Sequence, residues 1–397
     1  MKFEWQDLTL GDIVETVIDY RGKTPKKLGG DWSNTGYRAF SAKNIKTGQI
    51  VQHESIRFVD EEMYHKWMKE EIQRGDILIT SEAPFGQIFY WDSDEKIVLS
   101  QRLFGVRIKK QHDSRFIYYY MTTKEFQGEM DHRATGTTVV GLRQPELLKC
   151  VLRCPDYETQ RKISAILTAI DKKIAVNEEI NHNLQQQADA IFAREFLDLP
   201  ALPAGWTQGS LLDIANYQNG LAMQKYRPKT TERGIPVLKI KELRQGVCDD
   251  ASELCSESIS PEYIVQDGDV IFSWSGTLLV DFWCGGVCGL NQHLFKVTSD
   301  RYEKWFYYAW TRHHLQSFIA YASAMATTMG HIKRGELEKA EVLIPSPNDL
   351  SRIDSYLMPI YDAIISNRIE NHRLIELRDT LLPKLMSGEI DVSDVEI

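Results

Sequence analysis

Basic and polar side chains recur in short loops, several of which contain glycine or proline. These loops lie at residues 21–27, 41–46, 132–144, 224–229, 239–241, 273–277 and 331–334. Lys, Arg, Ser and Thr side chains hold phosphate groups, and Arg, Asn and Gln can read the edges of bases. A single lysine-rich loop is more often simply solvated. The group as a whole predicts a nucleic-acid surface, because such loops occur at matching places in the two halves of the chain.

The candidate DNA-binding residues are assigned at the level of loops. Those of the first half are Arg21, Lys23, Lys26, Lys43, Asn44, Lys46, Arg133, Thr137, Thr138 and Arg143. Those of the second half are Lys225, Arg227, Lys229, Lys239, Lys241, Trp274, Thr277, Thr327, Lys333 and Arg334.

The sequence lacks the short motifs that mark common catalytic centres. It has no Gly-x-Gly-x-x-Gly after a strand, no phosphate-binding Gly-x-x-x-x-Gly-Lys-Ser/Thr, no His-Glu-x-x-His and no Gly-x-Ser-x-Gly. It also lacks the Asn/Asp-Pro-Pro-Tyr/Phe tetrapeptide that amino-methyltransferases resemble one another in carrying. We therefore predict a chain without catalytic residues, which does not itself transfer methyl groups.

The six cysteines are dispersed, which is typical of a protein of the reducing cytoplasm. The pair Cys284 and Cys288 suggests zinc, but structural zinc sites need tight pairs, and the spacing of Cys248 and Cys255 is too loose. We predict that all six cysteines are buried and inert and that the chain has no metal site. His182 and His372 are expected to flank a helix interface.

Two long stretches, 158–196 and 350–386, must position the loops. Their apolar residues and asparagines step by alternating fours and threes, which predicts long helices that pack against each other. The seam of the first comprises Ile163, Leu167, Ile170, Ile174, Asn177, Asn181 and Leu184. The seam of the second comprises Ile353, Leu357, Ile360, Ile364, Asn367, Asn371 and Leu374. The stretches align without gaps at an offset of 190, and Pro359 is expected to kink the second near its start.

The repeat extends beyond these helices. Gly75-Asp76-Ile77-Leu78 matches Gly268-Asp269-Val270-Ile271, and Ser100-Gln101-Arg102-Leu103-Phe104 matches Asn291-Gln292-His293-Leu294-Phe295. Thr137-Thr138 before Gly141 matches Thr327-Thr328 before Gly330. Strands are expected at 76–80, 97–99, 104–108 and 149–152, and helices at 115–128 and 302–322.

The predicted fold is α+β, with two similar globular domains and two long helices packed as an antiparallel coiled coil in a pseudo-twofold repeat. We place the domains at 1–155 and 199–347, the first helical spacer at 156–198, and the second spacer and tail at 348–397. The Pro-containing segment 199–205 marks the boundary.

Composition limits the functional classes. The 397 residues are 43% hydrophobic and 26% charged, as in ordinary globular proteins, and no apolar run is long enough to span a membrane. The start of the chain lacks a basic-then-apolar signal segment, so a cytoplasmic location is expected. The net charge of −9 argues against a free-standing nucleic-acid binder and favours a subunit of a larger complex.

The order of these parts resembles the specificity subunit of type I restriction-modification systems, across essentially the whole chain. The resemblance is carried by the Trp5 and Trp206 openings, the Gly-Asp strands, the Thr-Thr loops, the two helices and the closing segment 374–390. It implies two target-recognition domains on double-stranded DNA, each reading one half of a bipartite asymmetric site. It also implies two modification subunits, which bind S-adenosylmethionine, and restriction subunits for cleavage. This chain itself is expected to hold no cofactor.

Two other classes remain open at this point. A coiled-coil scaffold with two protein-binding heads would explain the helices and the acidic charge, but it explains the matched basic loops poorly. An intact restriction enzyme would need the catalytic motifs that the sequence lacks.

Overall fold

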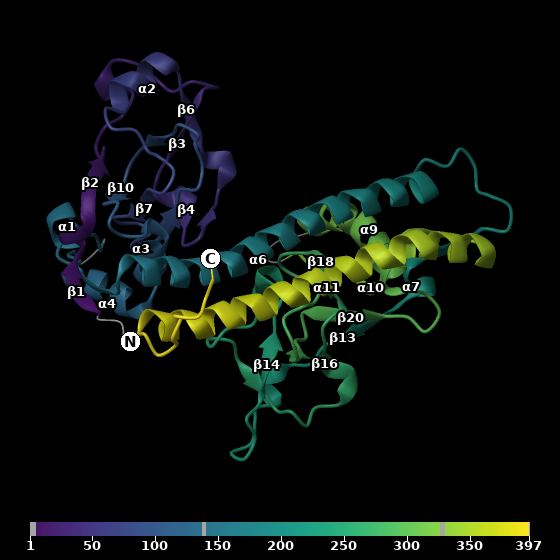
Figure 1. Cartoon of the computed structure of the whole chain (residues 1–397). Coiled ribbons are helices and arrows are strands. Elements are labelled where there is room, and N and C mark those ends of the chain that lie inside the picture. Colours follow the sequence, from purple (N-terminus) through teal and green to yellow (C-terminus); the bar gives the residue numbers. More distant parts are fainter. Residues whose placement is uncertain (1–4, 137–139, 326–329, 397) are drawn as a thin grey trace. The chain divides into compact units, whose positions relative to one another are not determined.

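The computed structural model describes residues 5–136, 140–325 and 330–396 of the chain (Figure 1). The described residues form two compact units. The first contains Met1–Asp171 and Leu377–Ile397, and the second contains Lys172–Glu376. Helix α6 (Tyr157–Phe192) and helix α11 (Pro347–Met386) each contribute a segment to both units. Among the described residues, no helix has both the length and the apolar character needed to cross a membrane.

The first unit is built on a four-stranded antiparallel sheet. Its order is β2 (Val14–Asp19), β10 (Leu103–Ile108), β7 (Ile77–Thr80) and β8 (Ile88–Tyr90). A smaller sheet has the order β6 (Arg57–Val59), β3 (Tyr37–Phe40) and β9 (Val98–Leu99). Two-stranded pairs are β1 (Gln6–Thr9) with β11 (Val151–Cys154), and β4 (Ile45–Lys46) with β5 (Gln49–Ile50). The helices are α1 (Leu10–Ile13), α2 (Glu61–Trp67), α3 (Ser114–Met121), α4 (Lys124–Arg133) and α5 (Gln144–Leu147).

The second unit repeats this plan. Its main sheet has the order β13 (Asn216–Asn219), β20 (Leu294–Thr298), β17 (Val270–Ser273) and β18 (Leu279–Phe282). Its other sheet has the order β15 (Leu254–Cys255), β14 (Ile235–Leu238), β19 (Cys288–Leu290) and β16 (Ile264–Val265). β12 (Thr207–Ser210) pairs with β21 (Glu341–Ile344), as β1 pairs with β11. The helices are α7 (Leu211–Ile214), α8 (Ile240–Gln245), α9 (Lys304–Met325) and α10 (Arg334–Lys339). The predicted α+β fold with an internal repeat is confirmed.

The repeated Gly-Asp motif is a structural device at the start of β7 and β17. Asp76 accepts a hydrogen bond from the Gln73 amide at 2.9 Å and forms an ion pair with Arg107, also at 2.9 Å. Asp269 accepts from the Gln266 amide at 2.8 Å and pairs with Lys296 at 2.7 Å. Burial raises the pKa of Asp76 despite its partner. These aspartates hold the turn before the strand, so they are occupied within the fold.

Most predicted elements occur, with shifted ends. The helix expected at 115–128 is two helices, because Thr123 accepts a hydrogen bond from the Phe126 amide and caps the start of α4. The strand expected at 149–152 is β11, which lies two residues later. The first long helix ends as predicted, since a π-helical turn (Ala193–Leu197) follows α6. Helix α11 continues through Pro359.

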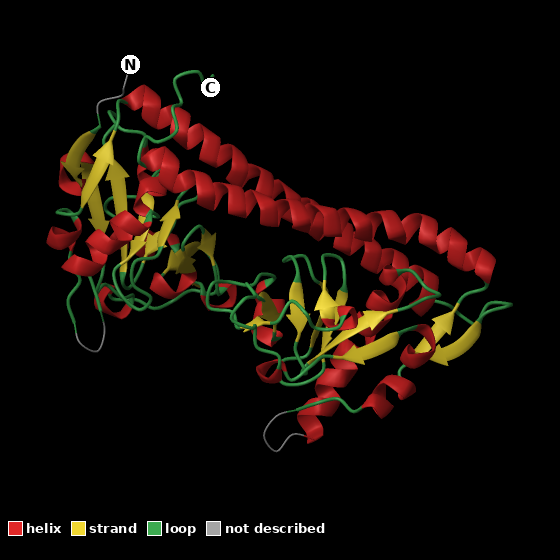
Figure 2. Cartoon of the chain, turned by 90° about the horizontal axis from the view of Figure 1, so that it is seen from below, coloured by secondary structure: helices red, strands yellow, loops and turns green. Residues whose placement is uncertain are grey.

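The helix seam contains two layers of paired asparagines in the second unit. Asn177 donates to Asn371 at 2.8 Å, and Asn367 donates to Asn181 at 2.9 Å. Asn371 also donates to the carbonyl of Ile174. Rising numbers on α6 meet falling numbers on α11, so the helices pack antiparallel, and Figure 2 shows them running side by side. The polar layers therefore lie across an otherwise apolar interface.

The structure places the predicted seam residues as follows. Nine are buried: Ile163, Leu167, Ile170, Ile174, Asn177, Ile353, Leu357, Ile364 and Asn371. Five are half-buried: Asn181, Leu184, Ile360, Asn367 and Leu374. At the two ends the helices also join the cores of the units. Ile163 and Leu167 pack with Leu385 in the first unit, and Ile353 and Leu357 belong to the main core of the second.

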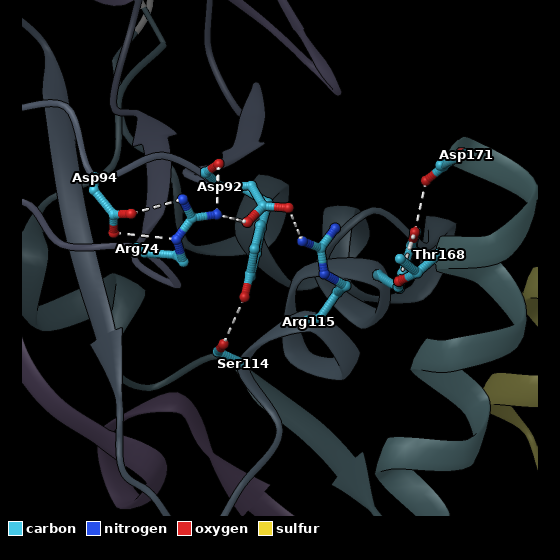
Figure 3. Close-up of polar contacts among 9 residues, drawn as sticks. Arg74, Asp92, Asp94, Ser114, Arg115, Thr168 and Asp171 are labelled. Carbon is cyan, nitrogen blue, oxygen red and sulfur yellow. Dashed lines mark hydrogen bonds and ion pairs between the residues drawn. The ribbon is translucent and has the colours of Figure 1, made fainter. Parts of the chain in front are cut away.

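In each unit, a tyrosine of the globular part contacts a segment of α6 or α11, and the type of contact differs between the units. In the first unit the Tyr119 hydroxyl of α3 donates to Asp171 of α6 at 2.6 Å, and Arg378 of α11 pairs with the same carboxylate at 3.0 Å. Figure 3 shows Asp171 reaching this contact from α6. In the second unit, Tyr308 of α9 instead packs its ring 5.5 Å from that of Tyr361. The same helix faces thus use a polar contact in one unit and an aromatic one in the other.

We predict that the single substitution Asn177→Ala lowers the free energy of unfolding of the full chain by about 1–3 kcal/mol, because it leaves buried Asn371 short of a partner. The double variant Asn177→Leu with Asn371→Leu should cost less, since it removes both polar partners together. Urea denaturation of the three proteins checks this. A double variant that is less stable than the single one would show that the layer itself stabilises the seam.

Candidate nucleic-acid interface

In each unit, one end of the main sheet gathers polar side chains from three strands. β7 ends at Thr80 opposite Leu103 of β10, and β17 ends at Ser273 opposite Leu294 of β20. The residue after each of these strands accepts a hydrogen bond from a distant segment of its unit. The Leu142 amide donates to Ser81 O at 3.0 Å, and the Ile332 amide donates to Trp274 O at 2.9 Å. We call the side chains at these ends the strand-end clusters. They comprise Asp19, Arg21, Glu82 and Arg102 in the first unit, and Asn219, Trp274, Ser275 and His293 in the second.

The first strand-end cluster consists of two acid–arginine pairs. Asp19 accepts hydrogen bonds from Arg21 Nε at 2.9 Å and from Arg21 Nη2 at 2.7 Å. The Arg21 guanidinium carbon lies 4.0 Å from the ring centroid of Phe104. Beside it, Arg102 Nε lies 3.0 Å from Glu82 Oε1, and both side chains are partly exposed. This cluster presents cationic donors on a rigid sheet end.

The second strand-end cluster is built from aromatic and neutral polar groups. Trp274 Nε1 donates to Asn219 Oδ1 at 3.1 Å, and its ring lies 5.7 Å from that of Phe295. His293 Nδ1 lies 3.1 Å from the Ser275 hydroxyl, with the imidazole 6.1 Å from the indole of Trp274. The cluster offers a flat aromatic surface and an imidazole edge.

The two clusters occupy equivalent positions. Asp19 lies opposite Phe104 in the sheet register, and Asn219 lies opposite Phe295. A carboxylate or an amide at this point holds a planar group against a phenylalanine ring. That group is a guanidinium in the first unit and an indole in the second. The backbone scaffold is therefore shared, and the functional groups that it presents differ.

The predicted DNA-binding residues divide by exposure. The exposed ones are Lys26, Lys43, Lys46, Arg143, Lys225, Arg227, Lys229, Lys241, Thr277, Lys333 and Arg334. Half-buried are Arg21, Lys23, Arg133, Lys239 and Trp274. Thr137, Thr138 and Thr327 lie outside the described residues. Of the predicted set, the strand-end clusters bring Arg21 and Trp274 to equivalent places.

Several predicted cations already have partners within their own unit. Arg227 and Lys239 both pair with Glu253, at 3.0 Å and 2.6 Å. Lys241 pairs with Asp249 at 3.3 Å, and Arg133 pairs with Glu129 at 3.2 Å. In the first unit, Lys23 donates to the Trp67 carbonyl at 3.0 Å, and burial lowers its pKa. These contacts reduce the charge that the loops can offer to phosphates.

The prediction of Asn44 as a base-reading residue is wrong. Its side chain is 1% exposed. It accepts hydrogen bonds from the Ser41 amide and hydroxyl and donates to the Gln52 carbonyl and the Ser55 hydroxyl. Asn44 closes a capping box around a short turn, and its amide has no capacity left for a base.

The cysteine prediction needs one correction. Five cysteines are buried, but Cys248 is partly exposed. A hydrogen bond with the Cys288 thiol lowers the pKa of Cys248. Within the described parts of the chain, no group of three His, Cys, Asp or Glu side chains has the arrangement of a metal site. His182 is exposed and contacts Gln186, and His372 lies 3.6 Å from Glu376.

The sequence analysis did not select Asp19, Glu82, Arg102, Asn219 or His293. A signal for two of them was present. The matched segments 100–104 and 291–295 share Gln, Leu and Phe, whereas Arg102 and His293 differ in charge within them. A variable position inside an otherwise matched strand start is typical of a surface that was altered while its scaffold was retained.

Comparison with known proteins identifies the class. The family model of the type I restriction modification DNA specificity domain matches residues 3–186 and again 203–377. The chain therefore belongs to this family, with one copy of the domain in each half.

Relatives match over their whole length. The specificity subunit of the type I restriction enzyme MjaIX from Methanocaldococcus jannaschii is 25% identical, with 100% of this chain and 99% of that protein covered. The HindI specificity subunit from Haemophilus influenzae is 22% identical, with coverage of 98% and 100%. The crystal structure of a type I restriction-modification S subunit from M. genitalium has the same fold, with a TM-score of 0.62, 14% identity and 96% coverage of both chains.

We predict that Asn44→Ala lowers the free energy of unfolding by about 1–3 kcal/mol, because it removes the buried amide that binds the Ser41 amide, the Gln52 carbonyl and the Ser55 hydroxyl around this turn. The matched control is Lys43→Ala at the adjacent exposed position, for which we expect a change within about 0.5 kcal/mol. Thermal unfolding of both variants checks the difference. Equal stability of the two would contradict a structural role for Asn44.

Proposed function

We propose that the chain is the DNA-recognition subunit of a type I restriction-modification complex and has no catalytic centre of its own. Each globular domain reads one half of a bipartite site in double-stranded DNA. One observation carries this proposal: a single fold occurs twice, and the equivalent sheet ends carry an acid–arginine cluster in one copy and an aromatic–imidazole cluster in the other. Unlike reading groups on a repeated scaffold require unlike half-sites, so the target is asymmetric.

Catalysis is assigned to partner subunits. Two modification subunits bind S-adenosylmethionine and methylate the site, and restriction subunits cleave DNA. The outer faces of the helix pair, with Lys172, Lys173, Glu178 and Glu179, are the proposed docking surface for the modification subunits. All four residues are exposed, and Lys173 is paired with Glu370 at 3.1 Å. Such a complex works on chromosomal DNA, which supports a cytoplasmic location.

Deletion of this gene from its native host should abolish methylation of adenines at one bipartite, asymmetric motif, because the modification subunits lose the subunit that recognises their site. The measurement is a genome-wide map of methylated adenines in the deletion strain and in the parent. Re-expression of the chain should restore the motif. A parent strain that carries the complete system and shows no motif dependent on this gene would contradict the proposal and favour the coiled-coil scaffold.

The helix pair is proposed to set the gap between the half-sites. The structure places Ala188, Phe192 and Phe196 in the core of the second unit, so an insertion beyond Leu184 would disturb that core. A cleaner test inserts one heptad between Ile174 and Asn177 of α6. A matching heptad is inserted between Asn371 and Leu374 of α11, which faces this stretch across the seam.

Seven added residues lengthen each helix by roughly 10 Å at about 1.5 Å per residue, or about three base pairs at 3.4 Å each. We therefore expect the methylated motif to keep both half-sites and to gain about three base pairs in its gap. The matched control inserts a heptad in α6 alone, which puts the asparagine layers out of register with the helix segments of the first core and should abolish methylation. An unchanged gap in the double insertion would show that the helix pair does not set the distance between the half-sites.

A further inference from the structure

We propose that the strand-end clusters are the base-reading centres of the two units, and that Arg102 reads a guanine in the half-site of the first unit. The inference deepens the proposed function and rests on it. It assigns specificity to Glu82 with Arg102 in the first unit and to Ser275 with His293 in the second, and of these four residues only Ser275 lies in a loop that the sequence pattern selects.

The hydrogen-bonding capacity of Arg102 supports this assignment. Its Nε lies 3.0 Å from Glu82 Oε1 in an ion pair, and its side chain remains 48% exposed. Among the described residues, its two terminal nitrogens have no partner. A guanidinium whose ion-pair contact is at Nε presents two parallel N–H donors at its far end. That pattern matches the N7 and O6 acceptors of guanine in the major groove.

A second arginine of the same unit shows what a purely structural pair looks like. Arg74 lies before β7, at the opposite end from Glu82. Each of its nitrogens donates, to Asp94 through Nε and Nη2 and to Asp92 through Nη1. Figure 3 shows Arg74 enclosed between the two carboxylates, with Arg115 on the far side of Asp92. Arg74 is saturated within the fold, whereas the terminal nitrogens of Arg102 have no partner in the part of the chain that the structure describes.

The backbone at Arg102 adds an independent observation. Its φ is +64°, in the left-handed region that residues with a β-carbon seldom adopt. Such conformations persist where the surrounding structure enforces them, and they concentrate at functional sites. Here the Ser81 amide donates to the Arg102 carbonyl at 2.9 Å and fixes the turn. The conformation places the side chain beside Glu82 at the sheet end.

The equivalent position of the second unit cannot make the same contact. His293 uses Nδ1 with Ser275, and its Nε2 lies 3.3 Å from the amide nitrogen of Gln292. An imidazole has at most one ring nitrogen left for a base, so it lacks the paired donors that guanine recognition by arginine uses. The neighbouring indole of Trp274 adds an apolar face. The two half-sites therefore differ at the base pair that each cluster faces.

The test transfers the second unit's pair into the first unit. The double variant Glu82→Ser with Arg102→His is expressed as the full chain in the deletion strain, and methylated adenines are mapped. We expect one guanine position in one half-site to relax, with discrimination against the other bases falling by about 10-fold or more. The other half-site and the gap should be unchanged. An unchanged motif at full methylation would overturn the inference.

Two further variants keep the test decisive. Arg74→His is the matched control in the same unit, and it should leave the specificity of the motif unchanged. Arg102→Lys keeps the charge but loses the paired donors, so it should relax the same guanine position if the double variant gives no methylation. Retention of full specificity by Arg102→Lys would then overturn the inference. Failure of the proposed function is separate, because the wild-type chain would then restore no bipartite motif.

Discussion

The antiparallel seam between α6 and α11 is the constraint on which the rest of the structure depends. Neither globular unit is complete in one stretch of sequence, because each takes a segment from both helices. The first core needs Leu167 from α6 and Leu385 from α11, and the second needs Phe192 and Leu357 in the same way. A slide of one helix by a heptad would keep an apolar seam but misplace both cores. The asparagine layers prevent that slide, since a shifted Asn371 would be buried without Asn177.

Each unit separates the parts that hold the fold from the parts that can vary. The start of β7 and β17 is fixed by the Gly-Asp turn, in which Asp76 and Asp269 bind both a backbone amide and a cation. The other end of the same strands carries the strand-end clusters. In these clusters, Arg21 lies over the ring of Phe104, and Trp274 packs against the ring of Phe295. Replacing such a cluster changes the groups presented to a ligand and leaves the buried sheet intact, so one scaffold can serve two different half-sites.

The parts that the sequence predicted are those with a periodic or repeated signal. Heptad spacing indicated both helices, and ungapped matches such as those around Asp76 and Asp269 indicated the duplicated α+β unit. The strand-end clusters were missed because Asp19, Glu82 and Arg102 are far apart in sequence and meet only through strand pairing. Asn44 was misassigned because loop composition does not show whether an amide is already used by its own turn. The break before α4 was missed for the same reason, since Thr123 acts through one local hydrogen bond.

The charge distribution indicates which part of DNA binding this chain supplies. Its net charge is −9, and several loop cations are paired with carboxylates of their own unit, as Arg227 and Lys239 are with Glu253. Paired cations release few counterions, so they contribute little of the salt-dependent affinity that phosphate contacts give. The pair of Glu82 with Arg102 differs, because the carboxylate contacts the guanidinium at Nε and leaves its terminal donors without a partner among the described residues. The paired loop cations are therefore poorly suited to attract a DNA backbone, and the strand-end clusters are better suited to discriminate between bases.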